Sequence, residues 1–217
     1  MSVILSRLSG AFLLNCELFA LTLLFALPLG LVVAFGSMSR CRLLSGAVKT
    51  FVWVIRGTPL MLQIIVIYLG PGLLGMNNPW PSGSGGRMVA AVVAFAINYA
   101  CYFSEIYRGG IEAVPKGQTE AGQVLGMTKP QIFFKVTLLQ VVKRILPSIT
   151  NEVITLVKDT SLAFVIGYAE LFTLVKRIAS REANVLPYVG AAIFYYIFNL
   201  VVAVAMEKLE KKMNYYN

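Results

Sequence analysis

Apolar residues in this 217-residue chain are gathered into blocks separated by short polar segments. The blocks are about twenty residues long, the length that an α-helix needs to cross roughly 30 Å of bilayer hydrocarbon. Hydrophobic residues make up 58% of the chain and charged residues only 13%, whereas a soluble domain has about a quarter charged residues. The alternation typical of outer-membrane barrel strands is absent. The sequence therefore predicts an all-α integral membrane protein.

We expect five transmembrane helices, at residues 12–35, 51–74, 88–106, 145–169 and 186–205. The first block is too long for the apolar core of a signal peptide and has no obvious cleavage site, so we expect it to be retained. Asn15 lies near its start, where we expect the membrane interface to hydrate it. Pro59, near the beginning of the second span, cannot donate a helix hydrogen bond and should bend or start a helix.

The net charge is +9, from 19 Lys and Arg against 10 Asp and Glu. In a membrane protein such an excess usually marks cytoplasmic loops, and we expect no nucleic-acid partner. Thirteen basic residues fall on one side of the five-span topology and five on the other, with Lys158 inside a span. The positive-inside rule then places the N-terminus outside and the C-terminus in the cytoplasm. The segment 170–183 is basic for an outside loop, and we expect it to be helical and partly embedded.

The chain has no histidine, and its three cysteines are scattered without a CxxC pair. Histidine acid–base catalysis and histidine-built metal sites are therefore excluded. Cys16, Cys41 and Cys101 are interpreted as small apolar residues. We expect neither a metal site nor a cofactor in this chain.

The interval 105–146 is the longest without a clean apolar run, and it holds six of the 19 basic residues. Gly126 can take the left-handed conformation that ends a helix. Thr128 followed by Gln131 is a capping-box pattern, and Pro130 suits the first turn of a helix. We therefore expect two short helices joined by a fixed elbow. From these residues alone it is either a docking surface at the membrane face or an ordinary solvated loop.

The segment EAGQVLGMTKPQIFFKVTLLQ resembles the EAA loop of the membrane subunits of ABC importers, Glu-Ala-Ala-x3-Gly-x9-Ile-x-Leu-Pro. The matching residues are Glu120, Ala121, Gly126 and Leu138, and the departures are Gly122, Val136 and Leu139. Three further segments, RGTPLMLQIIVIYLG, SEIYRGGIEAVPKGQ and LPSITNEVITLVKDTSLAFVIGYAEL, look like the polar-amino-acid subfamily, the histidine, glutamine and arginine permeases. Because Leu139 replaces the proline of the pattern, we expect any deviation of the fold to lie there first.

The resemblance implies the type I ABC importer fold, with a transmembrane domain at 12–208, a cytoplasmic EAA or coupling loop at 109–143 within it, and a charged tail at 209–217. It implies a multi-pass permease subunit of the bacterial inner membrane that forms the path for a polar, possibly cationic, amino acid. The implied partners are a second permease subunit (identical or related), two cytoplasmic ATPase subunits that bind ATP with Mg²⁺, and an extracytoplasmic substrate-binding protein. Glu120, Ala121 and Gly126 would contact the ATPase.

The chain contains no G-x-x-x-x-G-K-[ST] phosphate loop, so it is not expected to be the ATPase itself. An intramembrane enzyme is disfavoured by the lack of histidine and of paired carboxylates at a water-exposed face. A related ABC system with another substrate, and a channel-forming or structural membrane subunit, remain as alternatives.

Polar residues inside the spans are candidates for substrate contact, because an ionisable group at the bilayer centre costs about 2.5–3.5 kcal/mol. Glu152 and Asp159 are seven residues apart, nearly two turns, so they share a helix face with Thr155 close by. With Asn98 of the third span, they are expected to line a pocket for an ammonium group. The alternative is that Asp159 and Lys158 form structural ion pairs or subunit contacts.

Overall fold

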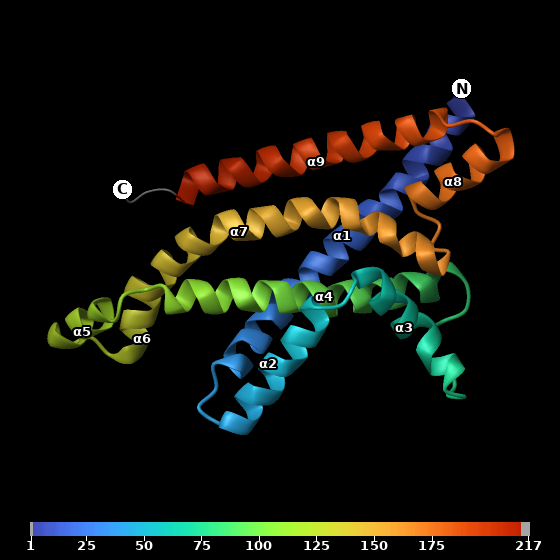
Figure 1. Ribbon diagram of the computed structural model, residues 1–217. Coiled ribbons are helices and arrows are strands. Elements are labelled where there is room, and N and C mark those ends of the chain that lie inside the picture. The colour runs from blue at the N-terminus through green and yellow to red at the C-terminus, as the bar shows by residue number, and fades with distance from the viewer. Residues whose placement is uncertain (1, 214–217) are drawn as a thin grey trace.

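The computed structural model describes residues 2–213, and every regular element in that part of the chain is helical (Figure 1). The α-helices are α1 (Ser2–Ser37), α2 (Arg42–Arg56), α3 (Leu60–Leu73), α4 (Ser84–Glu112), α5 (Lys116–Val124), α6 (Lys129–Ile132), α7 (Leu138–Asp159), α8 (Leu171–Glu182) and α9 (Leu186–Met213). A π-helical segment, Phe133–Thr137, joins α6 to α7, and a 3₁₀ segment, Thr160–Ile166, follows α7.

The long helix α4 is the element against which α1, α2, α3 and α7 pack (Figure 1). In the most apolar stretch of α4, 67% of the residues are buried inside the protein, whereas in that of α9 only 6% are buried. The contact with α1 is close, because a Cβ on Gly30 would lie 2.9 Å from the Cβ of Phe103. The core therefore lies around α4, and its largest fully buried members are Tyr99, Tyr168, Phe95 and Phe103.

Three helices are long and apolar enough to cross a membrane: α1 from Leu8 onward, α4 and α9. The expected spans 12–35, 88–106 and 186–205 fall inside them. The helix α7 is not among the three by length and composition, and it carries charged residues from Lys143 to Asp159. Its crossing of the membrane therefore stays a prediction.

The second expected span, 51–74, is broken where Pro59 led us to expect a bend or a helix start. The chain forms α2, which already begins at Arg42, and α3, and the two are bent by 105° at the break between them. Pro59 is the N-cap of α3, as its missing N–H led us to expect. The pair is apolar enough to count together as one bent span.

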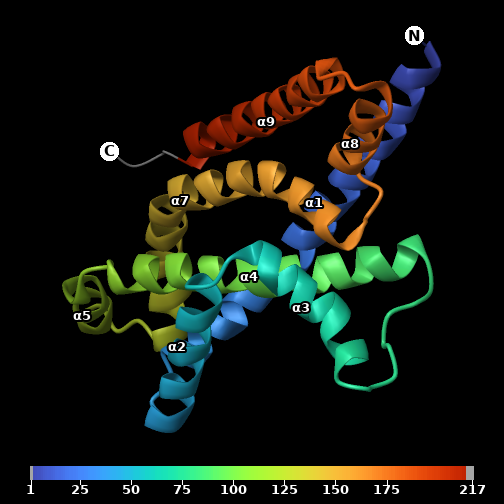
Figure 2. The same cartoon turned by 45° about the vertical axis from the view of Figure 1, so that its right-hand side comes forward.

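The fourth expected span, 145–169, is built from α7 and the 3₁₀ segment and not from one α-helix. Pro147 lies inside α7, which bends along its length (Figure 2). The following segment is helical, as expected: α8 buries one face, with Leu171 and Val175, and exposes Lys176 and Arg177 on the other.

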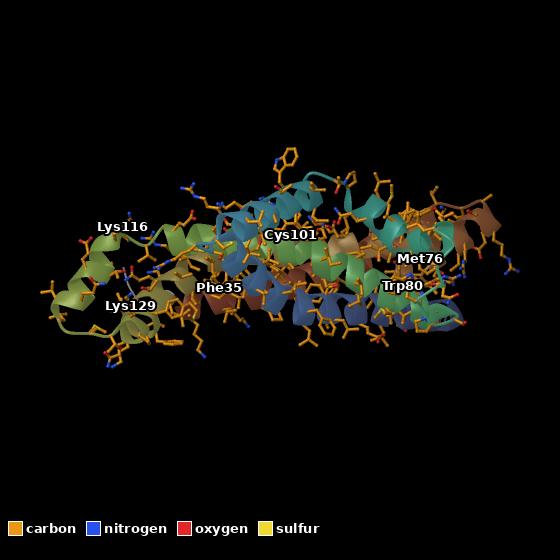
Figure 3. The ribbon with its side chains drawn as sticks, turned by 90° about the horizontal axis from the view of Figure 1, so that it is seen from below. Phe35, Met76, Trp80, Cys101, Lys116 and Lys129 are labelled. Carbon is orange, nitrogen blue, oxygen red and sulfur yellow. The ribbon has the colours of Figure 1, made fainter. Side chains whose placement is uncertain are left out.

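The molecule has two distinct ends. Lys116 and Lys129, the first residues of α5 and α6, lie at one end, and Met76 and Trp80 lie at the other (Figure 3). The start of α1 and α8 share the end of Trp80, whereas α9 finishes toward the end of α5 (Figures 1 and 2). Of the predicted tail 209–217, residues up to Met213 continue α9, and the rest lies outside the described residues.

Candidate functional site

The elbow between α5 and α6 begins with a helix stop made by backbone hydrogen bonds. Met127 N–H donates to the C=O of Gly122 (3.0 Å), and Gly126 N–H donates to the C=O of Gln123 (2.9 Å). These two bonds are the pair that defines a Schellman motif. Gly126 has a φ of +74°, which a residue with a side chain rarely adopts. The helix stop predicted at Gly126 is confirmed.

The next helix starts almost at once, with the capping box that the sequence predicts. Thr128 N–H donates to Oε1 of Gln131 at 2.8 Å, and Pro130 lies in the first turn of α6. Only Leu125 to Thr128 separate the two helices. Because both helix ends are closed by hydrogen bonds, the elbow is a fixed corner.

Gly122 occupies the position of the second alanine of the EAA pattern, and it packs closely against Ile132. A Cβ on Gly122 would lie 2.7 Å from Cγ1 and 3.0 Å from Cδ1 of Ile132. Ile132 is 3% exposed and forms the inner face of the short helix α6. The two helices of the elbow therefore approach more closely than an alanine would allow.

The outer surface of the elbow mixes polar and apolar side chains. Glu120 and Ala121 are exposed, and the apolar Val124 and Leu125 beside them are 88% and 79% exposed. Neighbouring apolar side chains that are this exposed in a polar segment are typical of a protein-binding surface.

Hydrogen bonds connect the elbow to the helices behind it. The guanidinium of Arg144 on α7 donates to the C=O of Ala113 at the end of α4. Gln140 of α7 donates to Oε1 of Gln118 on α5 at 3.4 Å. A π-helical segment ends at Thr137, and Leu139 lies in the first turn of α7, so a deviation from the family fold at Leu139 stays a prediction.

The break between α2 and α3 is held by side chains that replace its lost helix bonds. Nε2 of Gln63 donates to the C=O of Ile55 at 2.8 Å and lies 2.9 Å from Oγ1 of Thr58. Oγ1 of Thr58 donates to the C=O of Val54 at 3.0 Å. Backbone carbonyls freed in an apolar surrounding need such partners, so Thr58 and Gln63 stabilise the bend.

Asn98, one of the predicted substrate residues, is connected to this break. It is 4% exposed, and its Nδ2 donates to Oε1 of Gln63 at 3.0 Å. Asn98 therefore orients Gln63, and through it the turn between α2 and α3. Its contact with a substrate stays a prediction.

Asp159, the last residue of α7, accepts a hydrogen bond from Tyr99, the residue that follows Asn98. The hydroxyl of Tyr99 donates to Oδ2 of Asp159 at 2.8 Å. Asn98 and Tyr99, the hydrogen-bond partner of Asp159, are thus consecutive residues of α4. Glu152 and Thr155 are half-buried on α7, and neither side chain makes a hydrogen bond within the described part of the chain. Their polar atoms are available to a ligand.

A charged cluster lies further along α4. Arg108 donates to both oxygens of Glu105, at 2.6 and 3.2 Å, and to Glu112 at 2.7 Å. Arg56, the last residue of α2, lies 3.9 Å from Glu105 and stacks over the ring of Tyr102 at 5.0 Å.

A second polar network is buried near α8, and it corrects the expectation for Asn15. Asn15 is fully buried and not hydrated: its Nδ2 lies 3.1 Å from Oγ1 of Thr160, 3.3 Å from Oε2 of Glu170 and 2.9 Å from the hydroxyl of Tyr195. The network fixes Thr160, the neighbour of Asp159, against α1 and α9.

Glu170 caps α8, where it accepts hydrogen bonds from the N–H groups of Phe172 (2.6 Å) and Thr173 (2.7 Å). Burial raises the pKa of Glu170, and these hydrogen bonds oppose the rise. The group therefore serves as a structural anchor for α8.

Sequence reasoning missed Tyr99, Gln63 and Glu170 as organising residues. Each has a visible signal, because each is a polar residue within or directly after an apolar run. Each also has a partner that is 35 to 155 residues away along the chain, which no local pattern reveals. Between residues 2 and 213, no group of three or more Cys, Asp or Glu side chains is placed to hold a metal ion.

Curated relatives cover nearly the whole chain. The L-cystine transport system permease protein TcyB of Bacillus subtilis is 37% identical over 212 residues, which are 96% of this chain and 87% of that protein. The arginine transport system permease protein ArtQ of the same organism is 33% identical over 202 residues, 92% of this chain and 89% of that protein.

Solved structures show the same fold. The crystal structure of an amino acid ABC transporter with histidines matches with a TM-score of 0.86 and 32% identity, over 98% of this chain and 96% of that one. The MetNI methionine ABC transporter in an inward-facing conformation matches with a TM-score of 0.72 over 99% and 97%, and at 16% identity it shows the fold alone.

The family described as binding-protein-dependent transport system inner membrane component matches residues 26–215. That range includes the elbow, the break between α2 and α3, and the polar positions of α4 and α7. With an all-helical type I ABC importer fold, the chain belongs to this family of membrane permease components.

Proposed function

We propose that this chain is the permease subunit of an ABC importer for a polar amino acid, and that it forms the translocation path together with a second permease subunit. Relatives at 33–37% identity are named for L-cystine and arginine transport. The proposal places the chain as a multi-pass protein in a bacterial inner membrane, with its N-terminus outside and its C-terminus in the cytoplasm. The charge distribution supports that orientation.

The elbow is the observation on which the proposal depends. A fixed corner with exposed Glu120 and Ala121 beside exposed Val124 and Leu125 suits a partner that must push or pull on α7. We assign this partner as one of two cytoplasmic ATPase subunits, which bind ATP with Mg²⁺. Gly126 contributes the corner itself.

The substrate side of the proposal uses the polar residues of α4 and α7. Asn98, Glu152, Thr155 and Asp159 would contact the amino acid as it passes, with the carboxylates facing its ammonium group. A substrate-binding protein would deliver the amino acid at the end of the molecule opposite the elbow, where Trp80 (Figure 3) and α8 (Figure 1) lie.

Reconstitution tests this function directly. The chain is placed in liposomes with the ATPase and the binding protein of its proposed importer, and uptake of labelled L-cystine, L-arginine and L-glutamine is measured. We expect accumulation of at least one of them only with ATP and Mg²⁺ on the elbow side. Flux that ignores ATP would favour a channel, and ATP-driven uptake of none of the three would favour another substrate.

A further inference from the structure

Arg56 has unused hydrogen-bonding capacity. Its guanidinium stacks over Tyr102 at 5.0 Å and is 3.9 Å from Oε2 of Glu105, with 41% of the side chain exposed. Within residues 2–213 it makes no hydrogen bond to a side chain or carbonyl. An arginine presents five N–H donors in a rigid fork that matches a carboxylate. The stacking on Tyr102 orients this fork without occupying it.

Glu105 does not satisfy Arg56, because it is already paired. Both of its oxygens accept from Arg108, at distances of 2.6 and 3.2 Å. A separation of 3.9 Å from Arg56 is too long for a hydrogen bond. Arg56 therefore has an ion-pair contact with Glu105 but no hydrogen bond to it.

The register of α4 against α7 shows which other charge is near. The two helices are antiparallel: Tyr99 contacts Asp159, a Cβ on Gly110 would meet Ile145, and Arg144 binds the carbonyl of Ala113. Halfway between the first two contacts, Glu152 is level with Ser104 and Glu105. That is the level at which Arg56 contacts α4.

The two charges also face the same side of α4. Tyr99 contacts α7 and Tyr102 contacts Arg56, and residues three apart are only about 60° apart around a helix. No ion pair within 4.0 Å joins Arg56 and Glu152 in the described chain. At this level of α4 the described chain thus holds a guanidinium whose N–H groups are not hydrogen-bonded, Arg56, and a carboxylate that accepts no hydrogen bond, Glu152.

An α-amino acid carries a carboxylate and an ammonium group on the same carbon. It therefore offers an anion to Arg56 and a cation to Glu152. We propose that Arg56 binds the carboxylate of the transported amino acid while Glu152 binds its ammonium group. This inference rests on the proposed function, and it assigns to Arg56 a specificity for free carboxylates. Amides and esters of amino acids would keep only the contact with Glu152.

The test is binding to the assembled permease–ATPase complex in detergent, without the binding protein, by equilibrium dialysis. The probes are L-arginine, L-glutamine and L-cystine, followed by the carboxamide of whichever binds best. Loss of a charge-assisted contact should weaken binding roughly 10- to 100-fold. We therefore expect Arg56→Gln to lose that factor for the amino acid and to leave the affinity for the amide unchanged.

Two further variants make the result specific. Lys208→Gln removes an exposed cation of α9 and should change neither affinity. Arg56→Lys, which keeps a cation, should retain part of the preference for the amino acid, and it replaces Arg56→Gln if that variant does not assemble. Equal losses for amino acid and amide would show that Arg56 only supports Tyr102 and Glu105, and an unchanged preference would also overturn the proposal. If the wild-type complex binds and transports no amino acid, the proposed function fails instead.

Discussion

The elbow at one end of the molecule and the polar positions on α4 and α7 are built in opposite ways. The elbow is local: its Schellman bonds and its capping bond join residues three to five positions apart. The intramembrane positions are joined over long distances, Asn98 to Gln63 across 35 residues and Tyr99 to Asp159 across 60. Hydrogen bonds between near neighbours in the chain stay intact while the surrounding helices move. Hydrogen bonds between distant residues instead depend on how those helices are arranged. This arrangement suits a transporter in which the surface that binds the ATPase is separate from the path of the substrate but coupled to it.

The largest effect is expected at the corner of the elbow. Gly126→Val places a β-branched residue at a φ of +74°, which costs about 1–3 kcal/mol, although a Cβ there would meet nothing within 4 Å. The corner should open, so that ATP hydrolysis continues while uptake in vesicles is lost. ATPase activity and uptake are measured together in the same liposomes.

The matched control for this variant is Gly117→Val on α5. Gly117 has open space and no positive φ, so the exchange should leave coupling unchanged. Normal uptake by Gly126→Val would remove the elbow from the coupling mechanism.

An intermediate effect is expected from Asp159→Asn. The exchange removes the negative charge of the carboxylate, which accepts a hydrogen bond from Tyr99 at 2.8 Å, and keeps the size of the side chain. Loss of one charge-assisted contact with a substrate ammonium should lower uptake roughly tenfold. Binding of the ATPase, measured by co-purification, should not change, because the elbow is local.

Tyr99→Phe sharpens this result. It removes only the hydroxyl and leaves the carboxylate, so a smaller loss of uptake is expected than for Asp159→Asn. Unchanged substrate affinity and uptake in Asp159→Asn would mean that the pair is purely structural.

The smallest effect is expected from Gly122→Ala, which restores the alanine of the EAA pattern. Its Cβ would meet Ile132 at 2.7 Å, and overpacking of this kind costs about 1 kcal/mol. We expect a lower unfolding temperature of the purified chain and faster proteolysis at the elbow, with uptake nearly normal. In a double-mutant cycle, Ile132→Ala should cancel most of the added cost. Additive effects of the two exchanges would contradict the contact.

Local chemistry made much of the molecule predictable. The helix stop at Gly126, the capping box at Thr128 and the helix start after Pro59 depend on residues within one or two turns, and each was predicted correctly. The size of the bend within span 51–74, 105°, was not predicted, because it depends on how α2 and α3 pack against α4. Asn15 was misplaced for a related reason: its partners Thr160, Glu170 and Tyr195 come from distant parts of the chain.

The sequence by itself determined that this chain is a helical membrane protein, where its elbow lies and which family pattern it carries. Twenty-residue apolar blocks and local capping rules suffice for that, since both act over short stretches. Only the tertiary structure decided what the polar residues inside the spans contact. Asn98 orients the bend of α2 and α3, Tyr99 holds Asp159, and Arg56 comes level with Glu152. The physical reason is that in an apolar surrounding each polar group needs a partner, and which partner it finds depends on how the helices pack.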